Sequence, residues 1–186
     1  MKTISMIALI FALGASAAFA RINETIEEAT TRYGQGTQLL GSNRSSISLV
    51  RLATKMVTIK LANPNLWMFK SGDIRIYAAP YLRNDGKTVI GEIAFIIPKP
   101  INSDSDALNK MLTGLLDANS EGGKWVSGPN NQFDPQWERP GAKATYKVFG
   151  PSLTIISDDY YQSVINKINE TEKSSITNAI NSLDKF

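Results

Sequence analysis

The hydrophobic and polar positions after residue 20 follow two different periods, which predict strands in some segments and helices in others. Apolar and polar residues alternate cleanly in 57–61, and several further runs are short, apolar and separated by turn-forming residues. A period of two is typical of strands, and tight turns between such runs favour antiparallel pairing. The runs predicted as a meander are 66–70, 74–78 and 88–97, and those predicted as a hairpin are 143–149 and 152–157.

Two of the apolar runs differ in how clearly they predict a strand. In the run 88–97, we expect the apolar side chains to face the core of the sheet; they are Val89, Ile93, Phe95 and Ile97. The run 47–53 is apolar as well, but its pattern is ambiguous between a strand and a helix.

A short helix is predicted from about Ile26 to Tyr33. Thr25 and Glu28 precede and open it with the spacing of a capping box, in which each side chain satisfies a main-chain N–H at the start of the helix. Gly34 follows, and glycine readily takes the left-handed conformation that ends a helix.

Two further amphipathic helices follow the predicted sheets. Asp104 precedes apolar residues at helical spacing over 107–116, and an acidic side chain suits the positive end of a helix. Asp158 or Asp159 is expected to cap the third helix, which is near the C-terminus. The order is thus helix, sheet, helix, sheet, helix, which predicts an α+β fold with short antiparallel sheets, a meander plus a hairpin, packed with three amphipathic helices.

The first 20 residues have the features of a signal peptide. Lys2 precedes a mostly apolar segment that closes with Ala18-Phe19-Ala20, an A-x-A site of the kind that signal peptidase cuts. We expect a mature chain that begins at Arg21 and is exported to the periplasm or the extracellular space. A retained N-terminal anchor is the alternative, although the apolar segment is short for a membrane span.

The mature chain, 21–186, is long enough for a single α+β domain with its own core. Its pattern also allows a division into two sub-units, about 21–100 and 101–186. No later segment is long and apolar enough to suggest a transmembrane helix after the leader is removed.

The composition excludes several kinds of chemistry. The chain contains no Cys and no His, so it forms no disulfide and has no imidazole or thiol for Ser-His-Asp or Cys-His catalysis. Zinc sites and haem ligation normally need the same two residue types. We therefore expect no metal and no cofactor. The 20 Lys and Arg residues against 17 acidic ones are scattered singly, so nucleic acid is not an expected partner.

The segment 122–141 contains the most conspicuous candidate for a binding site. Trp125 and Trp137 are in a segment rich in turn-forming residues, and the other candidate residues there are Phe133, Glu138 and Arg139. The aromatic side chains could form a platform for a sugar ring or an extended peptide, with the charged residues as polar contacts. The other interpretation is a clasp that pins a long loop to the core. The tryptophans are near the ends of the loop and not at its centre, which favours the clasp.

Carboxylates are the other candidate functional groups, because an enzyme without His or Cys would depend on acids with environment-tuned pKa values. The pairs to inspect are Asp134 with Glu138 and Asp104 with Asp158. Helix capping and solvation of loops explain several of these acids equally well. We assign no catalytic residue from the sequence.

Several short motifs resemble those of known proteins. The runs NETIEEATTRYG, MFKSGDIRIYAAPYLRNDGKTVIGEIAFI, DANSEGGKW and QWERPGAKATY are similar to a family of exported, uncharacterised bacterial proteins. The N-terminal half is more distantly similar to the BamE/SmpA fold, whose members help to assemble outer-membrane proteins. This chain lacks the lipoprotein cysteine of that family, so the resemblance implies a fold more than a role.

The sequence as a whole predicts an exported protein with a non-catalytic binding or structural role in the cell envelope. Its partner would be an envelope protein or a glycan. Two alternatives remain: a carboxylate-based hydrolase of an envelope or extracellular polymer, and an outer-membrane assembly accessory resembling BamE.

Overall fold

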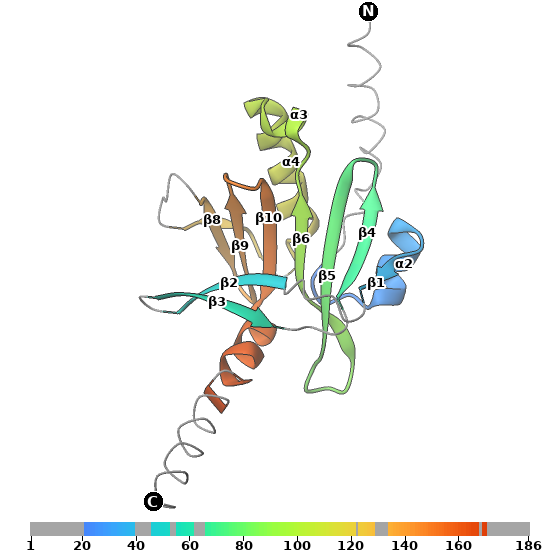
Figure 1. Cartoon of the computed structure of the whole chain (residues 1–186), viewed down its shortest axis with the longest axis vertical. Coiled ribbons are helices and arrows are strands. Elements are labelled where there is room, and N and C mark those ends of the chain that lie inside the picture. Colours follow the sequence, from blue (N-terminus) through green and yellow to red (C-terminus); the bar gives the residue numbers. More distant parts are fainter. Residues whose placement is uncertain are drawn as a thin grey trace, which may run out of the picture.

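The structure, a computed structural model, describes residues 21–39, 46–52, 55–61, 66–121, 123–128, 134–167 and 169–170. Eight strands form one antiparallel sheet in the order β1-β4-β5-β6-β10-β9-β8-β7 (Figure 1). The strands of this sheet are β1 (Thr37–Gln38), β4 (Trp67–Ser71), β5 (Ile74–Leu82), β6 (Thr88–Ile96), β7 (Val126–Ser127), β8 (Gln136–Arg139), β9 (Ala142–Lys147) and β10 (Ser152–Ser157).

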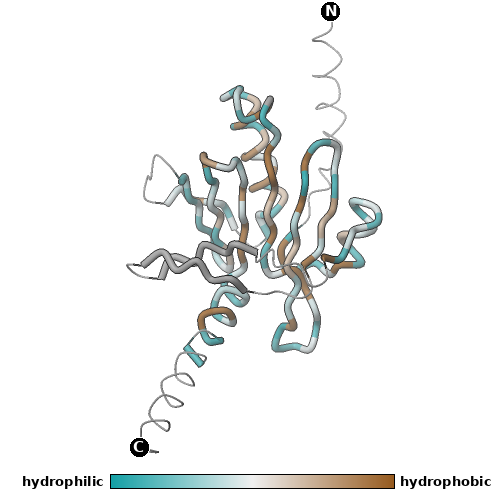
Figure 2. Tube along the Cα trace, viewed as in Figure 1, coloured by the Kyte–Doolittle hydropathy of each residue, from teal (hydrophilic) through white to brown (hydrophobic). Residues whose placement is uncertain are grey.

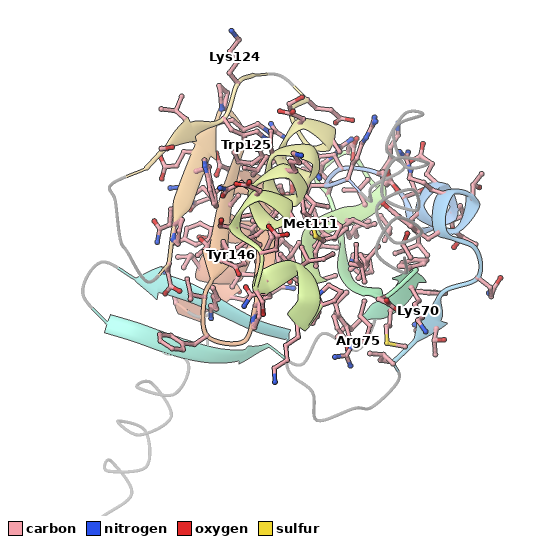
Figure 3. All side chains as sticks on the ribbon, turned by 90° about the horizontal axis from the view of Figure 1, so that it is seen from above. Lys70, Arg75, Met111, Lys124, Trp125 and Tyr146 are labelled. Carbon is pink, nitrogen blue, oxygen red and sulfur yellow. The ribbon has the colours of Figure 1, made fainter. Side chains whose placement is uncertain are left out.

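A separate hairpin is inserted between β1 and β4. It consists of β2 (Ser46–Leu52) and β3 (Lys55–Leu61), which pair only with each other. The ambiguous run 47–53 is thus largely a strand. The ribbon of this hairpin lies on the side of the large sheet opposite the helix α4 (Ser105–Ala118) (Figures 1 and 3).

The structure confirms the α+β class, but the sheet is larger than predicted. The meander is β4-β5-β6 and the hairpin is β9-β10, as the pattern indicated. The prediction of separate short sheets is wrong because β6 pairs with β10, with Phe95 opposite Leu153 and Ile93 opposite Ile155. Alternation along a strand shows that a strand exists, whereas its partner is set by packing between distant segments.

The topology has the same order of elements in its two halves. A helix, α2 (Ile26–Tyr33), precedes β1, β4, β5 and β6, and a second helix, α4, precedes β7, β8, β9 and β10. The last strand of each half meets the other at the centre of the sheet. The two halves therefore share one continuous ladder of main-chain hydrogen bonds.

Local sequence signals explain where the helices begin. The Thr25 main-chain N–H donates to Glu28 Oε2 at 2.7 Å, and the Glu28 N–H donates to Thr25 Oγ1 at 3.2 Å, so the predicted capping box is present. Asp104 Oδ1 accepts from the N–H groups of Asp106 and Ala107, each at 3.0 Å, at the start of α4. A four-residue helix, α3 (Lys99–Asn102), comes just before α4.

The C-terminal helical segment begins differently from the prediction. Residues 158–167 are helical, and Ser157 Oγ accepts from the N–H of Tyr160 at 3.3 Å. The cap is therefore Ser157, and the prediction of Asp158 or Asp159 is wrong. The helix starts directly where β10 ends, so the last strand residue also serves as the cap.

The core is mainly between the large sheet and α4. Side chains from the sheet meet Leu112, Leu115 and Leu116 of α4, and hydrophobic positions are frequent on the central strands and on this helix (Figure 2). The sheet residues in this cluster are Phe69, Ile76, Ala78, Ile90, Ile93, Phe95, Ala142, Ala144, Tyr146, Leu153 and Ile155. Among the described helices, none is both long and apolar enough to cross a membrane.

Candidate binding site

The two candidate tryptophans are on a narrow pair of strands at one end of the sheet. Trp125 precedes β7 and Trp137 is in β8, and these strands pair with Ser127 opposite Trp137. Both indole rings are partly buried and pack against the main core. Trp125 Nε1–H donates a hydrogen bond of 2.6 Å to the main-chain oxygen of Leu116 in the last turn of α4. These contacts are those of an anchored segment, and Trp125 lies beside α4 in Figure 3.

Arg139 extends the same anchor. Its side chain is buried, its Nε donates to the main-chain oxygen of Asn119 at 2.7 Å, and one terminal nitrogen donates to that of Pro140 at 2.8 Å. The guanidinium lies over the Trp125 ring, 5.2 Å from its centroid. Burial lowers the pKa of Arg139, and the charges of Glu121 and Asp158 oppose that shift. The side chain thus ties β8 to the end of α4.

Of the other two candidate residues in this segment, the structure describes Glu138 but not Phe133. Glu138 is exposed and forms an ion pair with Lys143 at 3.4 Å. Phe133 lies outside the described residues. The contacts of Trp125, Trp137 and Arg139 favour the clasp, and a binding role for the five residues stays a prediction.

Two of the four candidate carboxylates, Asp104 and Glu138, have structural partners. Asp104 caps α4, Asp158 is the first residue of the C-terminal helical segment, and Glu138 pairs with Lys143. In the part of the chain that the structure describes, no three or more potential metal-ligating side chains come together.

A different site emerges on the face of the sheet that points away from α4, here called the second face. Because side chains alternate along a strand, the register aligns Tyr77, Ala94, Thr154 and Thr145 across four neighbouring strands, β5, β6, β10 and β9. The helical residues Tyr160 and Val164 pack on one end of this face against Leu66 and Ala79.

The second face contains a groove of about 400 Å³, here called the second-face groove. A volume of this size is at the lower end of the range of small-ligand sites. The floor contains small side chains, Ala79 and Ala94, which leave room between larger neighbours. The residues that line it are Leu66, Tyr77, Ala79, Glu92, Ala94, Ile96, Lys147, Phe149, Gly150, Ser152 and Thr154.

Two aromatic rings and two aliphatic hydroxyl groups give the groove mixed chemistry. Tyr77 and Phe149 are the aromatic residues of its lining, and Ser152 and Thr154 supply the hydroxyls. Phe149 is 80% exposed and lies two residues after the end of the strand β9. Phe149 precedes Gly150, whose φ of +78° permits the tight turn into β10.

The groove also contains charges of opposite sign. Glu92 is 5% exposed. Burial lowers the pKa of the Lys147 ammonium, and the charges of Asp134 and Glu92 act in the opposite direction. The ammonium is therefore partly desolvated and depends on neighbouring carboxylates, so an anionic group entering the groove would find a cation with reduced hydration.

Two more cations are on the same face, toward the other edge of the sheet. Lys70 and Arg75 are directly opposite each other on β4 and β5, both exposed, and they lie near one another in Figure 3. The register continues from Arg75 through Ile96 and Ser152 to Lys147. Like charges directly opposite each other weaken a sheet, so this pair favours the approach of an anion.

Little in the sequence indicated these groove residues. Glu92 and Lys147 are in predicted strands at positions that alternate with apolar ones, which is usual for solvent-exposed residues. The one available signal was the acidic residue within the apolar run 88–97. The place of Glu92 in the groove depends on the pairing of β5, β6, β10 and β9 around it.

The chain matches no protein-family model, and comparisons with curated proteins and with solved structures find no match either. The site therefore has to be interpreted from its own chemistry.

Proposed function

We propose that this protein is exported, has no catalytic role, and binds a partner protein in the cell envelope through the second-face groove. The observation that carries the proposal is the composition of the groove: a floor of small residues, two aromatic rings, and a partly desolvated ammonium at Lys147. Apolar pockets with a few polar groups at defined positions are typical of binding sites.

The partner is expected to offer an apolar side chain next to acidic groups. The volume of about 400 Å³ suits one or two side chains rather than a long polymer. Lys147, Arg75 and Lys70 provide the complementary charge along one row of the face. A protein segment supplies both features within a few residues, so we favour a protein over a glycan.

The geometry of the groove gives less support to the two alternative functions, a carboxylate-based hydrolase and an outer-membrane assembly accessory. Among the described residues that line the groove, Glu92 is the carboxylate, whereas carboxylate-based hydrolysis of glycosides ordinarily uses a pair. An assembly accessory would use the same groove for an outer-membrane protein, and the identity of the bound partner distinguishes this case.

The experiment is photo-crosslinking in cells that export the protein. A benzoylphenylalanine residue replaces Phe149 at the groove, and in a control it replaces Thr113, which is exposed on α4. We expect a defined protein adduct from position 149 and none from position 113. The adduct should disappear when Ala94→Trp fills the groove.

A matched variant separates filling of the groove from general damage. Thr145→Trp places the same ring on the same face and in the same cross-strand row, but Thr145 is not among the groove residues. The adduct should survive this change, and a thermal melt should show that both variants fold. An adduct that forms equally from both positions, or persists in Ala94→Trp, would overturn the proposal.

A further inference from the structure

The described chain begins with a turn that is held firmly by the rest of the fold. The Ile22 side chain is 1% exposed, and its main-chain N–H donates to Asn119 Oδ1 at 3.1 Å. The Asn23 N–H donates to the Ile90 oxygen at 2.7 Å, and the Ile90 N–H donates to the Glu24 oxygen at 2.8 Å. These hydrogen bonds therefore fix the position of the main chain within a few residues of the predicted cleavage point, Ala20–Arg21.

The turn brings the main chain of Arg21 toward the side chain of Glu24. Residues 22 and 23 form the turn, and Asn23 has a φ of +70°, a left-handed conformation that asparagine tolerates better than most residues. Such a conformation reverses the chain direction over a few residues. The nitrogen of Arg21 thus lies close to a carboxylate three residues later.

The Glu24 carboxylate is buried and short of partners. Its side chain is 7% exposed, and neither of its oxygens has a hydrogen-bond partner. Arg32 forms an ion pair with it at 3.1 Å. Burial raises the pKa of Glu24, and the Arg32 charge and the Arg21 main-chain N–H oppose this. That N–H is therefore close enough to act on the carboxylate without the geometry of a full hydrogen bond.

The other charged groups around Glu24 do not supply the missing hydrogen bonds to its carboxylate. Glu28 adds a repulsive charge, and the Arg21 guanidinium contributes only a weak attraction. That guanidinium lies 3.8 Å from Glu121 and has a buried Nε without a hydrogen-bond partner. The Tyr33 hydroxyl is buried without a partner as well, and burial together with the Glu24 charge raises its pKa. A buried carboxylate with one cation and no hydrogen bond is costly to maintain.

We propose that the α-ammonium group of Arg21, released when the leader is removed, is the missing partner of Glu24. This inference rests on the proposed export. An endopeptidase specific for small-x-small sites hydrolyses the Ala20–Arg21 bond with water, leaving a carboxylate on Ala20 and an ammonium on Arg21. The single N–H of the amide then becomes a rotating group with three donors and a positive charge. Removal of the leader thus completes a buried ion pair and stabilises the mature fold.

The test compares two chains that differ only before Arg21. One begins at Arg21 with a free amine, released from a fusion by a protease that leaves a native N-terminus. The other keeps one additional glycine before Arg21. Both are made with the native sequence, with Glu24→Gln, and with Glu27→Gln as the control, because Glu27 is exposed on the same helix.

We expect the pKa of the Arg21 amine to lie at least about one unit above the ordinary range of about 7.7–8.0. Acylation of this amine at pH 7.5 should be at least about sixfold slower than in Glu24→Gln, because a one-unit rise in pKa from the ordinary range lowers the deprotonated fraction by about that factor at this pH. Glu27→Gln should behave like the native chain. The added glycine should lower the Tm by about 2–4 °C in the native and Glu27→Gln chains, and by much less in Glu24→Gln.

An amine that is acylated at the same rate in the native and Glu24→Gln chains would overturn the inference. So would a glycine that lowers the Tm equally in both. If Glu24→Gln does not fold, the amine pKa of the native chain decides alone, and an ordinary value contradicts the inference. The intact mass of the exported protein tests the premise separately: a chain starting elsewhere than Arg21 overturns the inference, whereas failure of groove crosslinking overturns only the binding proposal.

Discussion

Trp125 and Leu116 are joined by a 2.6 Å hydrogen bond from the indole N–H to a main-chain oxygen in the last turn of α4. The last carbonyls of a helix have no partner within the helix, and here a side chain nine residues later supplies one. The N–H of Asn119 donates to the same oxygen at 2.9 Å. The end of α4 and the start of β7 are therefore fastened at one point.

Replacement of this indole should measure the strength of the clasp. Trp125→Phe keeps an aromatic ring but removes the N–H donor and weakens the contact with the Arg139 guanidinium. We expect a loss of about 1–2 kcal/mol in the free energy of unfolding, measured by urea denaturation. Trp137→Phe is the control, because Trp137 packs against the same core from β8. A smaller loss for Trp125→Phe than for Trp137→Phe would contradict the clasp.

Arg139 should be intolerant even of lysine. Its guanidinium donates to two main-chain oxygens from different nitrogens, those of Asn119 and Pro140, and a lysine ammonium cannot reproduce this fork. Arg139→Lys should cost about 2–3 kcal/mol of unfolding free energy. The exposed Glu138 offers a contrast in the neighbouring position, since Glu138→Gln breaks only a surface ion pair and should change stability by less than about 1 kcal/mol. Similar losses in both variants would show that Arg139 is not an anchor.

These residues illustrate which parts of the structure the sequence could predict. The capping box of Thr25 and Glu28 depends on neighbours three positions apart, and the sequence predicted it correctly. The burial of Arg139 depends on Asn119, which is 20 positions away and at the end of another element. Charged residues are rarely buried, so the sequence analysis, although it favoured a clasp by the tryptophans, considered Arg139 only as a polar contact for a ligand.

The strand β6 shows a second limit. Val89, Ile93, Phe95 and Ile97 are all buried, as predicted, yet Ile90 and not Val89 belongs to the main core cluster. The register with β5 shifts between Ala79 and Pro80, which leaves one extra residue in β6. A bulge of this kind moves the following side chains to the other face, and simple alternation does not reveal it.

Acid should weaken an ion pair in the β5–β6 turn. Arg83 Nε donates to Asp85 Oδ1 at 3.1 Å, and this hydrogen bond lowers the pKa of Asp85 to about 2. Because the folded-state pKa lies below the ordinary value of 3.8, the stabilisation is complete above about pH 4 and is lost as the pH falls toward 2.

Arg83→Gln should therefore return the Asp85 pKa toward its ordinary value, followed by the carboxyl chemical shift in an NMR titration. Lys87→Gln is the control, because the Lys87 side-chain charge is the weakest of the influences on Asp85. An Asp85 pKa that stays near 2 in Arg83→Gln would show that the guanidinium is not its cause.

The close packing of Tyr160 and Tyr81 leaves no room for a side chain at Gly91, the extra residue of the β6 bulge. This can be tested with a pair of substitutions of opposite expected sign. A Cβ atom on Gly91 would meet Tyr160, which packs from the C-terminal helical segment, and would lie 2.6 Å from Tyr81 Cδ1. These two rings pack on each other with centroids 5.2 Å apart, so neither can move away without disturbing the second face. Gly91→Ala should therefore cost about 2–3 kcal/mol or more in unfolding free energy.

Gly114→Ala is the matched substitution. Gly114 is inside α4 and a Cβ there has nothing within 4 Å, so the gain in helix propensity should stabilise the protein by about 0.5–1 kcal/mol. Urea denaturation of both variants measures the two signs. If Gly91→Ala is neutral, the C-terminal helical segment is not held on the second face by Tyr160. The end of the groove formed by Leu66 and Ala79 would then be shaped by other contacts.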